Sequence, residues 1–394
     1  MQLHPSDSTP AQSKGSISII LPHLGGGGAE RLHVYLANDW IERGYCVEFI
    51  LLSRSGELIE LLRPEITVTD LAAERIRDAI TKLASYLGKT RPDVILCAMW
   101  PLTSAVVVSW LLSGRRSSLF LSDHEHLSHS YLGQNRVRPG YLKNLIRFTY
   151  PLASGVITVS QGVKDDLCRL GNLSEKRVKV IYNPAATGIS PVRESSDTSD
   201  RLWGKGFTFH LLAVGRLSVQ KDFRTLIKAF SLLPKSLNAK LVILGEGSSR
   251  NELEELVTQL GLTERVALPG FVVDPYPFFR SADLFVLSSE WEGFGNVIVE
   301  ALECALPVVS TDCPSGPSEI LEDGRYGRLV PVGDAAALAS AMALSLSASH
   351  DRELLMNRAK DFSVQKISDE YLAYLFHKGG LIDSRSYKKL SDLR

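Results

Sequence analysis

The sequence lacks the features that mark secreted, metal-binding and nucleic-acid-binding proteins. It has five cysteines, an odd number, and none forms a Cys-x-x-Cys pair, so the pattern gives no cysteine metal site and fits a reducing compartment. Lysine plus arginine and aspartate plus glutamate each total 44, so no net field favours nucleic acid as a partner. The polar start MQLHPSDSTPAQSKGS has no apolar signal-peptide core. We therefore expect residues 1–16 to be a disordered tail of a cytoplasmic protein.

Long hydrophobic runs are also rare, and one of them needs interpretation. Residues 94–112, VILCAMWPLTSAVVVSWLL, carry no charge and are about as long as a membrane-spanning helix. Pro101 divides the run, its first half is short and β-branched, and a turn, Arg91-Pro92-Asp93, precedes it. We favour a buried strand (VILCAMW) followed by a helix (LTSAVVVSWLL) over a membrane span.

Short apolar runs alternate with helical patterns along the chain, and 44% of the residues are hydrophobic, enough to bury sizeable cores. In the first half, strands are expected at residues 17–22, 47–52, 94–100, 118–123 and 155–160. In the second half, they are expected at residues 209–215, 240–245, 265–270, 283–289, 307–312 and 327–331. Short apolar strands separated by helices predict βαβ units, and hence α/β domains with parallel sheets covered on both faces.

The polar segment AATGISPVRESSDTSDRLWGKG interrupts this alternation and indicates a domain boundary. We predict an N-terminal domain over residues 17–188, a linker over 189–206 and a C-terminal domain over 207–364. An amphipathic helical pattern, FSVQKISDEYLAYLF, leads into the last segment, residues 365–394. Two doubly wound α/β domains in tandem have a cleft between the carboxyl ends of their sheets, where such folds bind ligands.

The first candidate anion site is the turn LGGGGAER, residues 24–31, between the first strand and a helix. Its four glycines let the backbone approach a ligand closely and present N–H groups at a helix N-terminus. The pattern is neither Gly-x-Gly-x-x-Gly nor a Walker loop, since no Gly-Lys-Ser/Thr follows. A flexible strand-to-helix turn is the alternative.

A second candidate is the loop VGRLSVQKDF, residues 214–223, which follows a predicted strand and ends at a helix. Its two cations, Arg216 and Lys221, are five positions apart, so both could reach one dianionic group. A guanidinium fork and a point charge together suit a diphosphate. Two solvated loop charges are the alternative.

The stretch SEWEGFGNVIVEAL places Glu292 in the turn after a strand and a Gly-Phe-Gly turn at the start of a helix. The free N–H groups and dipole of that helix end favour a phosphate or a negative leaving group. Glu300 falls one or two turns into the helix, where its carboxylate can accept hydrogen bonds from two hydroxyls, as on a ribose. Glu292 can do the same for a sugar. The alternative is that Glu300 is a surface residue of the helix and Glu292 is an acid that caps its N-terminus.

Another turn, TDCPSGPSEIL, follows the strand at residues 307–312. Ser315 and the backbone of Gly316 lie where they could touch a donor, whereas Glu319 is expected to be an ordinary helix-start acid.

The stretch SDHEHLSHS follows a strand of the first domain and raises the question of metal binding. His124 and His126 flank Glu125, but no convincing third or fourth ligand lies nearby, and Cys97 belongs to another segment. We therefore expect no metal site.

Taken in order, four motifs resemble those of retaining glycosyltransferases of family 4, which have the GT-B fold. They are the turn GGGGAE, the Arg-x4-Lys of GRLSVQK, the Glu-x7-Glu of EGFGNVIVE and the turn CPSGPSEIL. The resemblance covers residues 17–376, and the second-half motifs are specific as a set. It implies two Rossmann-like doubly wound domains facing a cleft, with the C-terminal helix crossing back to the N-terminal domain.

The resemblance also implies the donor contacts. Arg216 and Lys221 would bind the diphosphate of a nucleotide sugar, and Glu292 would hold sugar hydroxyls while Glu300 accepts those of the ribose. The backbone that would approach the phosphates and sugar belongs to Gly27, Gly28, Phe294, Gly295 and Asn296. The backbone that would lie near the nucleotide base belongs to Phe271 and Val272.

A retaining mechanism without a metal follows from the same resemblance. His124 looks like the family's histidine near the transferring sugar, with His126 a close second. Glu292 would not be a nucleophile, in contrast to retaining glycosidases. The acceptor would attack on the face that the diphosphate leaves, and Arg216 and Lys221 would stabilise the departing charge. No Asp-x-Asp metal motif is present, and the cationic pair would replace Mg²⁺.

The predicted activity is transfer of a hexose or N-acetylhexosamine from a nucleotide sugar, UDP being favoured by family prevalence. The acceptor would be a glycan or a polyprenyl-diphosphate-linked saccharide in cell-surface polysaccharide or glycolipid synthesis. Lys221→Ala is expected to lower turnover by orders of magnitude with little effect on melting. The alternatives are a nucleotide-sugar epimerase on the same architecture, which would need no acceptor, and a non-catalytic sugar-nucleotide-binding protein, which would have lost the motif cations or acids.

The segment RVRPGYLKNLIRFTYPLASG, residues 136–155, places arginines and a lysine among leucine, isoleucine, phenylalanine and tyrosine. On a helix this forms a basic amphipathic surface suited to anionic lipid headgroups. It predicts peripheral binding at the inner face of the plasma membrane. A core-packed helix with a solvated basic face is the alternative.

Overall fold

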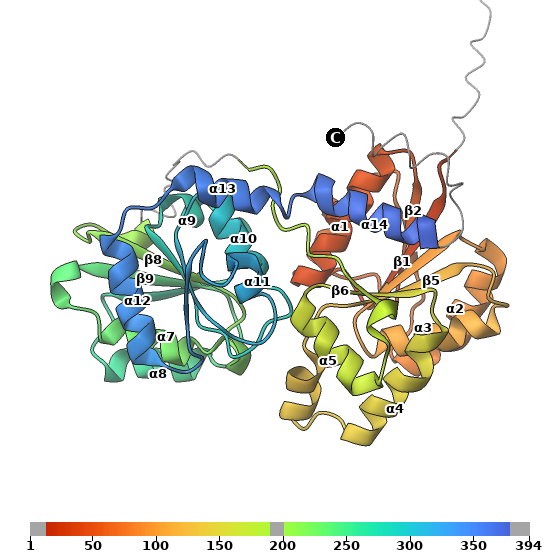
Figure 1. The fold of residues 1–394 in the computed structure, drawn as a ribbon, viewed down its shortest axis with the longest axis horizontal. Coiled ribbons are helices and arrows are strands. Elements are labelled where there is room, and N and C mark those ends of the chain that lie inside the picture. Colours follow the sequence, from red (N-terminus) through yellow and green to blue (C-terminus); the bar gives the residue numbers. More distant parts are fainter. Residues whose placement is uncertain (1–12, 190–200, 379–394) are drawn as a thin grey trace, which may run out of the picture. The chain divides into compact units, whose positions relative to one another are not determined.

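The structure, a computed structural model, describes residues 13–189 and 201–378 and is drawn in Figure 1. Its strands form a seven-stranded sheet in the order β3-β2-β1-β4-β5-β6-β7 and a six-stranded sheet in the order β10-β9-β8-β11-β12-β13. Pairs such as β1 with β2 and β8 with β9 are parallel. Backbone contacts divide the chain into two compact units, one of Met1–Ser122, Leu152–Gly155 and Leu372–Arg394, the other of Asp123–Pro151 and Val156–Tyr371.

The first sheet is built from short strands that are mostly buried. They are β1 (Ser16–Leu21), β2 (Cys46–Leu51), β3 (Thr67–Asp70), β4 (Val94–Ala98), β5 (Ser118–Asp123), β6 (Gly155–Thr158) and β7 (Val178–Val180). The helices of this part of the chain are α1 (Gly28–Glu42), α2 (Ile76–Thr90), α3 (Leu102–Leu112), α4 (Pro139–Thr149) and α5 (Gln161–Gly171). The two strands that the sequence did not predict, β3 and β7, are the edge strands of the sheet. Because helices cover an edge strand less completely than a central strand, an edge strand needs no continuous apolar run.

The second sheet repeats this design. Its strands are β8 (Phe209–Val214), β9 (Ala239–Leu244), β10 (Val266–Gly270), β11 (Leu284–Leu287), β12 (Val308–Thr311) and β13 (Arg328–Val330). Its helices are α7 (Phe223–Ser231), α8 (Arg250–Gln259), α9 (Tyr276–Ser281), α10 (Asn296–Glu303), α11 (Pro317–Leu321), α12 (Ala335–Ser347) and α13 (Arg352–Lys360), followed by α14 (Val364–Lys378). The strands predicted in the second half are confirmed, and the whole chain has the predicted α/β fold with two doubly wound parallel sheets.

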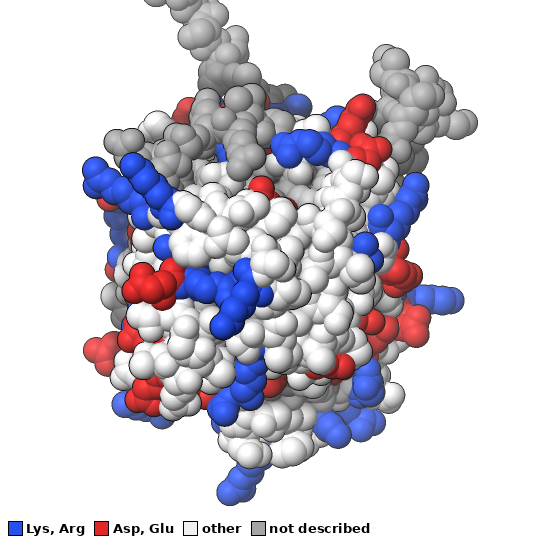
Figure 2. All heavy atoms as spheres, turned by 90° about the vertical axis from the view of Figure 1, so that its left-hand side faces the viewer, with Lys and Arg blue, Asp and Glu red and all other residues white. Residues whose placement is uncertain are grey.

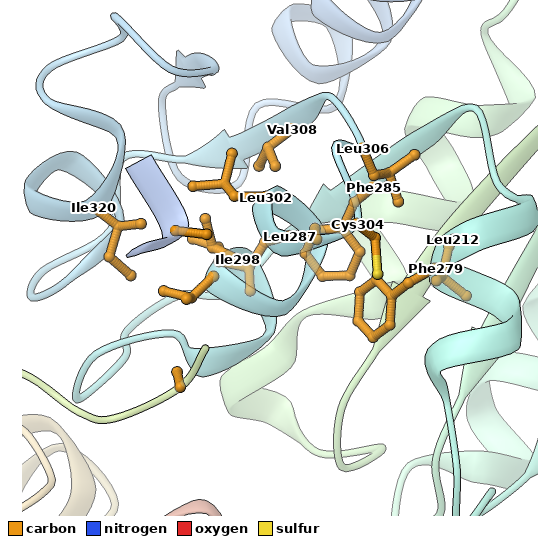
Figure 3. Packing of buried hydrophobic residues seen from close by; sticks show 14 of the residues in the cluster. Leu212, Phe279, Phe285, Leu287, Ile298, Leu302, Cys304, Leu306, Val308 and Ile320 are labelled. Carbon is orange, nitrogen blue, oxygen red and sulfur yellow. The ribbon is translucent and has the colours of Figure 1, made fainter. Parts of the chain in front are cut away.

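Helix α10 is anchored by apolar packing, which Figure 3 shows from close by. Its Ile298 and Leu302 are fully buried among residues that include Phe285 of β11 and Val308 of β12. Burying a side chain of this size contributes about 1.5–3 kcal/mol. This packing fixes the start of α10, where the Gly-Phe-Gly turn lies.

The apolar run at residues 94–112 divides as predicted. Its first part is the buried strand β4, and its second part is helix α3, which begins directly after Pro101. Among the described residues, no helix is both long and apolar enough to cross a membrane.

The segments predicted as tail, linker and C-terminal extension are described only in part. Residues 1–12, 190–200 and 379–394 lie outside the described residues. Within the predicted linker, Trp203 is buried, its ring stacks on His210 with centroids 4.6 Å apart, and its Nε1 donates to Ser281 Oγ at 2.8 Å. Trp203 therefore belongs to the core beside the second sheet.

The end of α14 packs on elements of the first unit. The Phe376 ring lies 5.0 Å from that of Tyr45, and the Tyr374 ring 5.5 Å from that of Phe120. These aromatic contacts tie the helix to the first sheet.

Charged side chains on the face in Figure 2 are interspersed, with no large patch of a single sign. This distribution accords with the equal numbers of acidic and basic residues.

Candidate functional site

The loops after β8 and β11 meet at the point where the second sheet changes direction. These two strands are neighbours, with Leu211 opposite Leu284 and Leu212 opposite Phe285, although β9 and β10 lie between them in sequence. In a doubly wound sheet of this order, the connections on either side of such a pair leave in opposite directions and open a ligand-binding crevice at the carboxyl ends. The topology thus brings together the two loops that hold the predicted donor-binding cations and acid.

At the centre of these loops, Lys221 and Glu292 form an ion pair. Lys221 Nζ lies 2.5 Å from Glu292 Oε1, and Ser289 Oγ donates to the same oxygen at 2.6 Å. The Glu292 side chain is 7% exposed and that of Lys221 16%. A carboxylate buried this far needs a charged or hydrogen-bonding partner, because its desolvation is costly. The pair also leaves the ammonium with further N–H donors for a ligand.

Backbone and side-chain hydrogen bonds join the two loops around this pair. Ser288 Oγ donates to the carbonyl of Lys221 at 2.8 Å, and Gln220 Nε2 donates to the carbonyl of Trp291 at 3.0 Å. The amide of Glu290 donates to the carbonyl of Gln220 at 2.8 Å. Sequence analysis assigned no role to Ser288, Ser289 or Gln220. The signal that could have found the serines is two hydroxyls at the end of an otherwise apolar strand.

Arg216 lies on the same loop as Lys221 but is not part of the ion pair. Its side chain is exposed, and no ion pair or hydrogen bond links its guanidinium to another residue in the described part of the chain. The loop itself is held by close backbone contact, because a Cβ at Gly245 would overlap the carbonyl of Gly215 and one at Gly247 that of Leu217. Arg216 is therefore a free cation on a well-anchored loop.

The Gly-Phe-Gly turn is anchored by its phenylalanine. Phe294 is 2% exposed, and its ring packs against Tyr182 at 5.5 Å and Phe362 at 5.4 Å between centroids. Gly295 adopts φ +100°, which favours glycine, and no side chain caps the helix that begins at Asn296. The first turn of α10 therefore presents backbone N–H groups and a positive dipole end.

The two acids of α10 have different surroundings. Glu300, the predicted ribose-binding residue, is partly exposed. Glu303 is 7% exposed and accepts hydrogen bonds from the amides of Gly188 at 2.6 Å and Ile189 at 3.2 Å. Burial raises the pKa of Glu303, and these amides partly offset that effect. Glu303 thus holds the segment at Gly188 and Ile189, a role that was not expected from the sequence because the partner is distant along the chain.

The turn after β12 combines a strained serine with a tightly packed glycine. Ser315 has φ +73°, and its buried hydroxyl has no hydrogen-bond partner among the described residues. Gly316 has φ +96°, and a Cβ there would overlap the carbonyl of Phe294. This contact places the turn directly beside the Gly-Phe-Gly turn.

Glu319, expected to be an ordinary helix-start acid of α11, instead caps another helix. Its carboxylate accepts from the amide of Gln161 at 2.8 Å and from that of Gly162 at 3.2 Å. These amides belong to the first turn of α5, where an acid stabilises the helix dipole. All three residues lie in the second compact unit.

The histidines after β5 also lie in the second unit. His126 is 8% exposed, with Nδ1 3.3 Å from Asp166 Oδ2; burial lowers its pKa, while the Asp166 charge acts in the opposite direction. His124 is partly exposed, and a Cβ on Gly293 would overlap its carbonyl oxygen. His124 therefore lies beside the loop of Glu292. Among the described residues, no cluster of three or more His, Cys, Asp or Glu could hold a metal ion.

The glycine turn of the first unit faces the chain's own carboxylates. Gly27 is the residue before α1, and a Cβ there would overlap Glu30, just as one at Gly26 would overlap Glu57. Gly28 is the first residue of α1. In this structure, the space left by the absent Cβ of these two glycines is therefore occupied by two carboxylates of the same unit.

The predicted base-binding segment follows β10 and exposes apolar side chains. Phe271 is 56% exposed and Val273 79%, while Val272 between them is partly exposed. Exposed apolar residues at the carboxyl edge of a sheet offer a surface on which a planar base can pack.

Comparisons with known proteins identify the class of protein to which this chain belongs. The family model described as Glycosyl transferases group 1 matches residues 206–362, and that described as Glycosyltransferase Family 4 matches residues 26–187. The lipopolysaccharide core biosynthesis glycosyltransferase LpsE of Rhizobium meliloti is 30% identical over 366 residues, covering 89% of this chain and 96% of the relative. The chain therefore belongs to these glycosyltransferases, and the predicted family is confirmed.

Two enzymes of Campylobacter jejuni are more specifically named relatives. The N-acetylgalactosamine-N,N'-diacetylbacillosaminyl-diphospho-undecaprenol 4-alpha-N-acetylgalactosaminyltransferase is 29% identical over 380 residues, 91% of this chain and 99% of the relative. The alpha-1,4-N-acetyl-D-galactosaminyltransferase that acts on GalNAc-alpha-(1->4)-GalNAc-alpha-(1->3)-diNAcBac-PP-undecaprenol is 29% identical over 375 residues, 90% of this chain and 97% of the relative.

Solved structures share the fold. Anabaena HepE in complex with UDP-glucose has a TM-score of 0.75 at 24% identity, covering 92% of this chain and 99% of that chain. A glycosyltransferase from Rickettsia africae has a TM-score of 0.76 at 19% identity, covering 93% and 99%. The predicted GT-B fold of two Rossmann-like domains is confirmed.

Proposed function

We propose that this glycosyltransferase moves a hexose or N-acetylhexosamine from a UDP-linked sugar to a lipid-linked saccharide, in the synthesis of a cell-surface polysaccharide or glycolipid. The observation that carries the proposal is the Lys221–Glu292 pair, which joins the loops after β8 and β11 at the direction change of the second sheet. Three named relatives support it: two act on undecaprenol-diphosphate-linked saccharides, and a solved structure of the same fold holds UDP-glucose.

In this proposal, the cations bind the diphosphate and the acids bind hydroxyls. Arg216, which has no partner among the described residues, and Lys221 hold the phosphate oxygens together with the N–H groups at the start of α10. Glu292 already receives Lys221 and Ser289 on Oε1, which leaves Oε2 to accept a sugar hydroxyl. Glu300, farther along α10, accepts the ribose hydroxyls.

Transfer proceeds with retention and without a metal. Glu292 acts as a holder, with Lys221 and Ser289 fixing its Oε1, and the transfer described here forms no covalent bond to it. The acceptor hydroxyl attacks the anomeric carbon on the face from which the diphosphate departs, and its proton passes to the leaving diphosphate. Arg216, Lys221 and the α10 dipole stabilise the charge that builds on that group. His124 positions the transferring sugar.

The experiment is a thermal-shift screen of nucleotide sugars, followed by transfer assays with the stabilising donor. A ligand that binds only the folded chain raises its melting temperature by mass action. We expect a UDP-sugar to stabilise the chain, and the anomeric configuration of the donor to be retained in the product by NMR. An inverted product would refute retention, and full activity in the presence of EDTA is expected of a metal-independent enzyme.

The acceptor requirement separates this function from its alternatives. A transferase releases UDP quickly only when the saccharide acceptor is present, whereas an epimerase converts the sugar nucleotide alone. Rapid acceptor-independent conversion would therefore count against transfer, and binding without any turnover would indicate a sugar-nucleotide-binding protein.

We also propose that α4 binds an anionic membrane surface. Its Leu142 and Ile146 are buried, whereas Tyr141 is 57% exposed and Phe148 67%. These two aromatic residues line an apolar groove of about 250 Å³, and four exposed cations lie in the same segment of the chain. Those cations are Arg136, Arg138, Lys143 and Arg147. Exposed aromatic side chains in a segment that also carries exposed cations suit the interface of an anionic bilayer.

Cosedimentation with anionic liposomes tests this proposal. Binding is expected at low ionic strength, weaker binding at high salt, and a large loss on Tyr141→Ser with Phe148→Ser. Leu260→Ser, which alters an apolar residue that is 39% exposed on the second domain, is the matched control. Equal binding of wild type and the aromatic double variant would refute a role for α4.

A further inference from the structure

A polar cavity of about 390 Å³ lies at the amino-terminal edge of the first sheet. Three arginines line it, Arg91, Arg115 and Arg116, together with three serines, Ser117, Ser118 and Ser154. All of these residues belong to the first compact unit.

The position of the cavity separates it from the transfer chemistry. Ser118 is the first residue of β5, and Asp93, another lining residue, directly precedes β4. Parallel α/β sheets bind their substrates outside the carboxyl ends of the strands, which is the opposite edge. The sugar donor and its leaving group therefore do not explain why arginines gather here.

The charges of the cavity are unbalanced. Three arginines and one carboxylate line the cavity, and that carboxylate, Asp93, already accepts from the amide and the hydroxyl of Ser16 at 2.8 and 2.9 Å through Oδ2. Arg91 Nε donates only to the neutral carbonyl of Gly88, at 3.2 Å. Arg116 has no ion pair or hydrogen bond with any residue that the structure describes. Like charges gathered in one cavity repel each other, so an anion bound among them is stabilised.

One of the three arginines is held in a fixed orientation. The Arg115 guanidinium stacks over the Trp110 ring, with Cζ 5.0 Å from the centroid. Trp110 is 4% exposed, and its Nε1 donates to the carbonyl of Ser117 at 2.8 Å, so the ring cannot turn. A stacked guanidinium keeps its planar fork of donors, which loses less entropy when it binds two oxygens of one anion.

We propose that this cavity binds a phosphoryl group. The guanidinium forks match the oxygens of a phosphate or diphosphate, and the serine hydroxyls at the cavity wall are further donors. The phosphoryl group belongs either to a free phosphate compound or to a lipid headgroup. An exposed apolar side chain suits the second source: Leu152, 40% exposed, lines the cavity.

The test is isothermal titration of the full chain with inorganic pyrophosphate, in saturating UDP so that the donor site is filled. Arg115→Ala with Arg116→Ala is expected to weaken pyrophosphate binding at least about tenfold, because each charge-assisted contact is worth about a factor of ten. The matched control is Arg77→Ala on α2, an arginine 71% exposed, and it should leave the affinity unchanged. The proposal is overturned if wild type, the double variant and Arg77→Ala bind pyrophosphate with equal affinity. It is also overturned if wild type binds neither pyrophosphate nor lipid phosphate.

Arg116→Gln keeps the test decisive if the double variant does not fold. Arg116 is exposed and without a partner among the described residues, so its replacement leaves the cavity intact. It should weaken pyrophosphate binding several-fold while the affinity for UDP, which binds elsewhere, stays the same. Unchanged pyrophosphate binding in Arg116→Gln would argue against the site.

Vesicle flotation then distinguishes the two sources of the phosphoryl group. Vesicles of phosphatidic acid in phosphatidylcholine should bind the chain less after Arg116→Gln if the ligand is a lipid headgroup, and phosphatidylcholine alone should not respond to the substitution. If pyrophosphate binding depends on Arg116 but flotation does not, the ligand is a free phosphate compound.

Discussion

Replacing Lys221 with alanine removes the charged partner of a buried carboxylate, and the effect on stability follows from the pair's surroundings. Breaking a buried ion pair from one side costs about 3–5 kcal/mol, because the other charge stays buried. Here the Lys221 side chain is 16% exposed and Ser289 still donates to Glu292 Oε1. Water entry and that retained hydrogen bond reduce the expected loss to about 2–3 kcal/mol in the free energy of unfolding.

A second substitution separates the cost of leaving the Glu292 charge unpaired from the cost of losing its contact with Lys221. Glu292→Gln removes the charge that Lys221→Ala leaves unpaired, so the double variant should be more stable than Lys221→Ala alone. The measurement is thermal unfolding of Lys221→Ala, Glu292→Gln, the double variant and wild type, followed by fluorescence. Since 1 kcal/mol shifts the melting of a domain of this size by about 2–4 °C, the Lys221→Ala transition should fall by about 4–12 °C. This replaces the sequence-based expectation that melting would hardly change.

Activity is measured on the same proteins at a temperature where all are folded. Lys221→Ala should lower kcat by about 10²–10³, as the loss of one preorganised group on a developing charge does. A Lys221→Ala protein that melts like wild type, or a double variant no more stable than the single one, would refute the pairing argument. Near-normal turnover would refute the assignment of Lys221 to the leaving group.

Three further substitutions test the frame around the site and one buried base. Gly316→Ala forces a Cβ onto the carbonyl of Phe294, at a residue with φ +96°. Urea unfolding should show the free energy of unfolding reduced by at least about 1–3 kcal/mol, and UDP should bind more weakly. Unaltered stability would contradict the packing of this turn. Leu302→Ala, on the buried face of α10, should lower the free energy of unfolding by about 2–5 kcal/mol. The kcat per folded molecule should change little, which activity and unfolding measured side by side would reveal. Burial lowers the pKa of His33 from 6.5 to about 4. At pH values between these two, His33 is protonated in the unfolded chain but neutral in the folded chain. Stability should therefore fall by about 1.4 kcal/mol per pH unit as the pH drops from 6.5 toward 4, and His33→Gln should flatten that slope in unfolding curves taken at several pH values.

The sequence predicted what depends on local pattern. Buried strands are continuous apolar runs, so β4 and β11 could be located, and the cations and acids of the donor loops stand out because they follow such runs. The short edge strands β3 and β7 have no such pattern, and their place in the sheet depends on pairing with distant residues.

Roles that depend on distant partners could not be predicted. Glu319 caps α5 and Glu303 holds the chain near Gly188, but in sequence both are acids on short helices like many others. Trp203 lies in a polar segment that resembles a linker, yet its ring fills the core beside Ser281. In each case the partner is more than 70 positions away in sequence, and no local period encodes that contact.

The glycine-to-carbonyl contacts between neighbouring loops limit how this enzyme can be altered. A Cβ at Gly245, Gly247 or Gly316 would overlap the carbonyl of Gly215, Leu217 or Phe294 respectively, so these loops have no room to shift toward their neighbours. In the proposed donor site, a change of donor sugar is therefore expected to come from exchanging side chains on these loops, such as those of Ser289 and Ser315. Libraries for altered donor use should vary those positions and leave loop length constant.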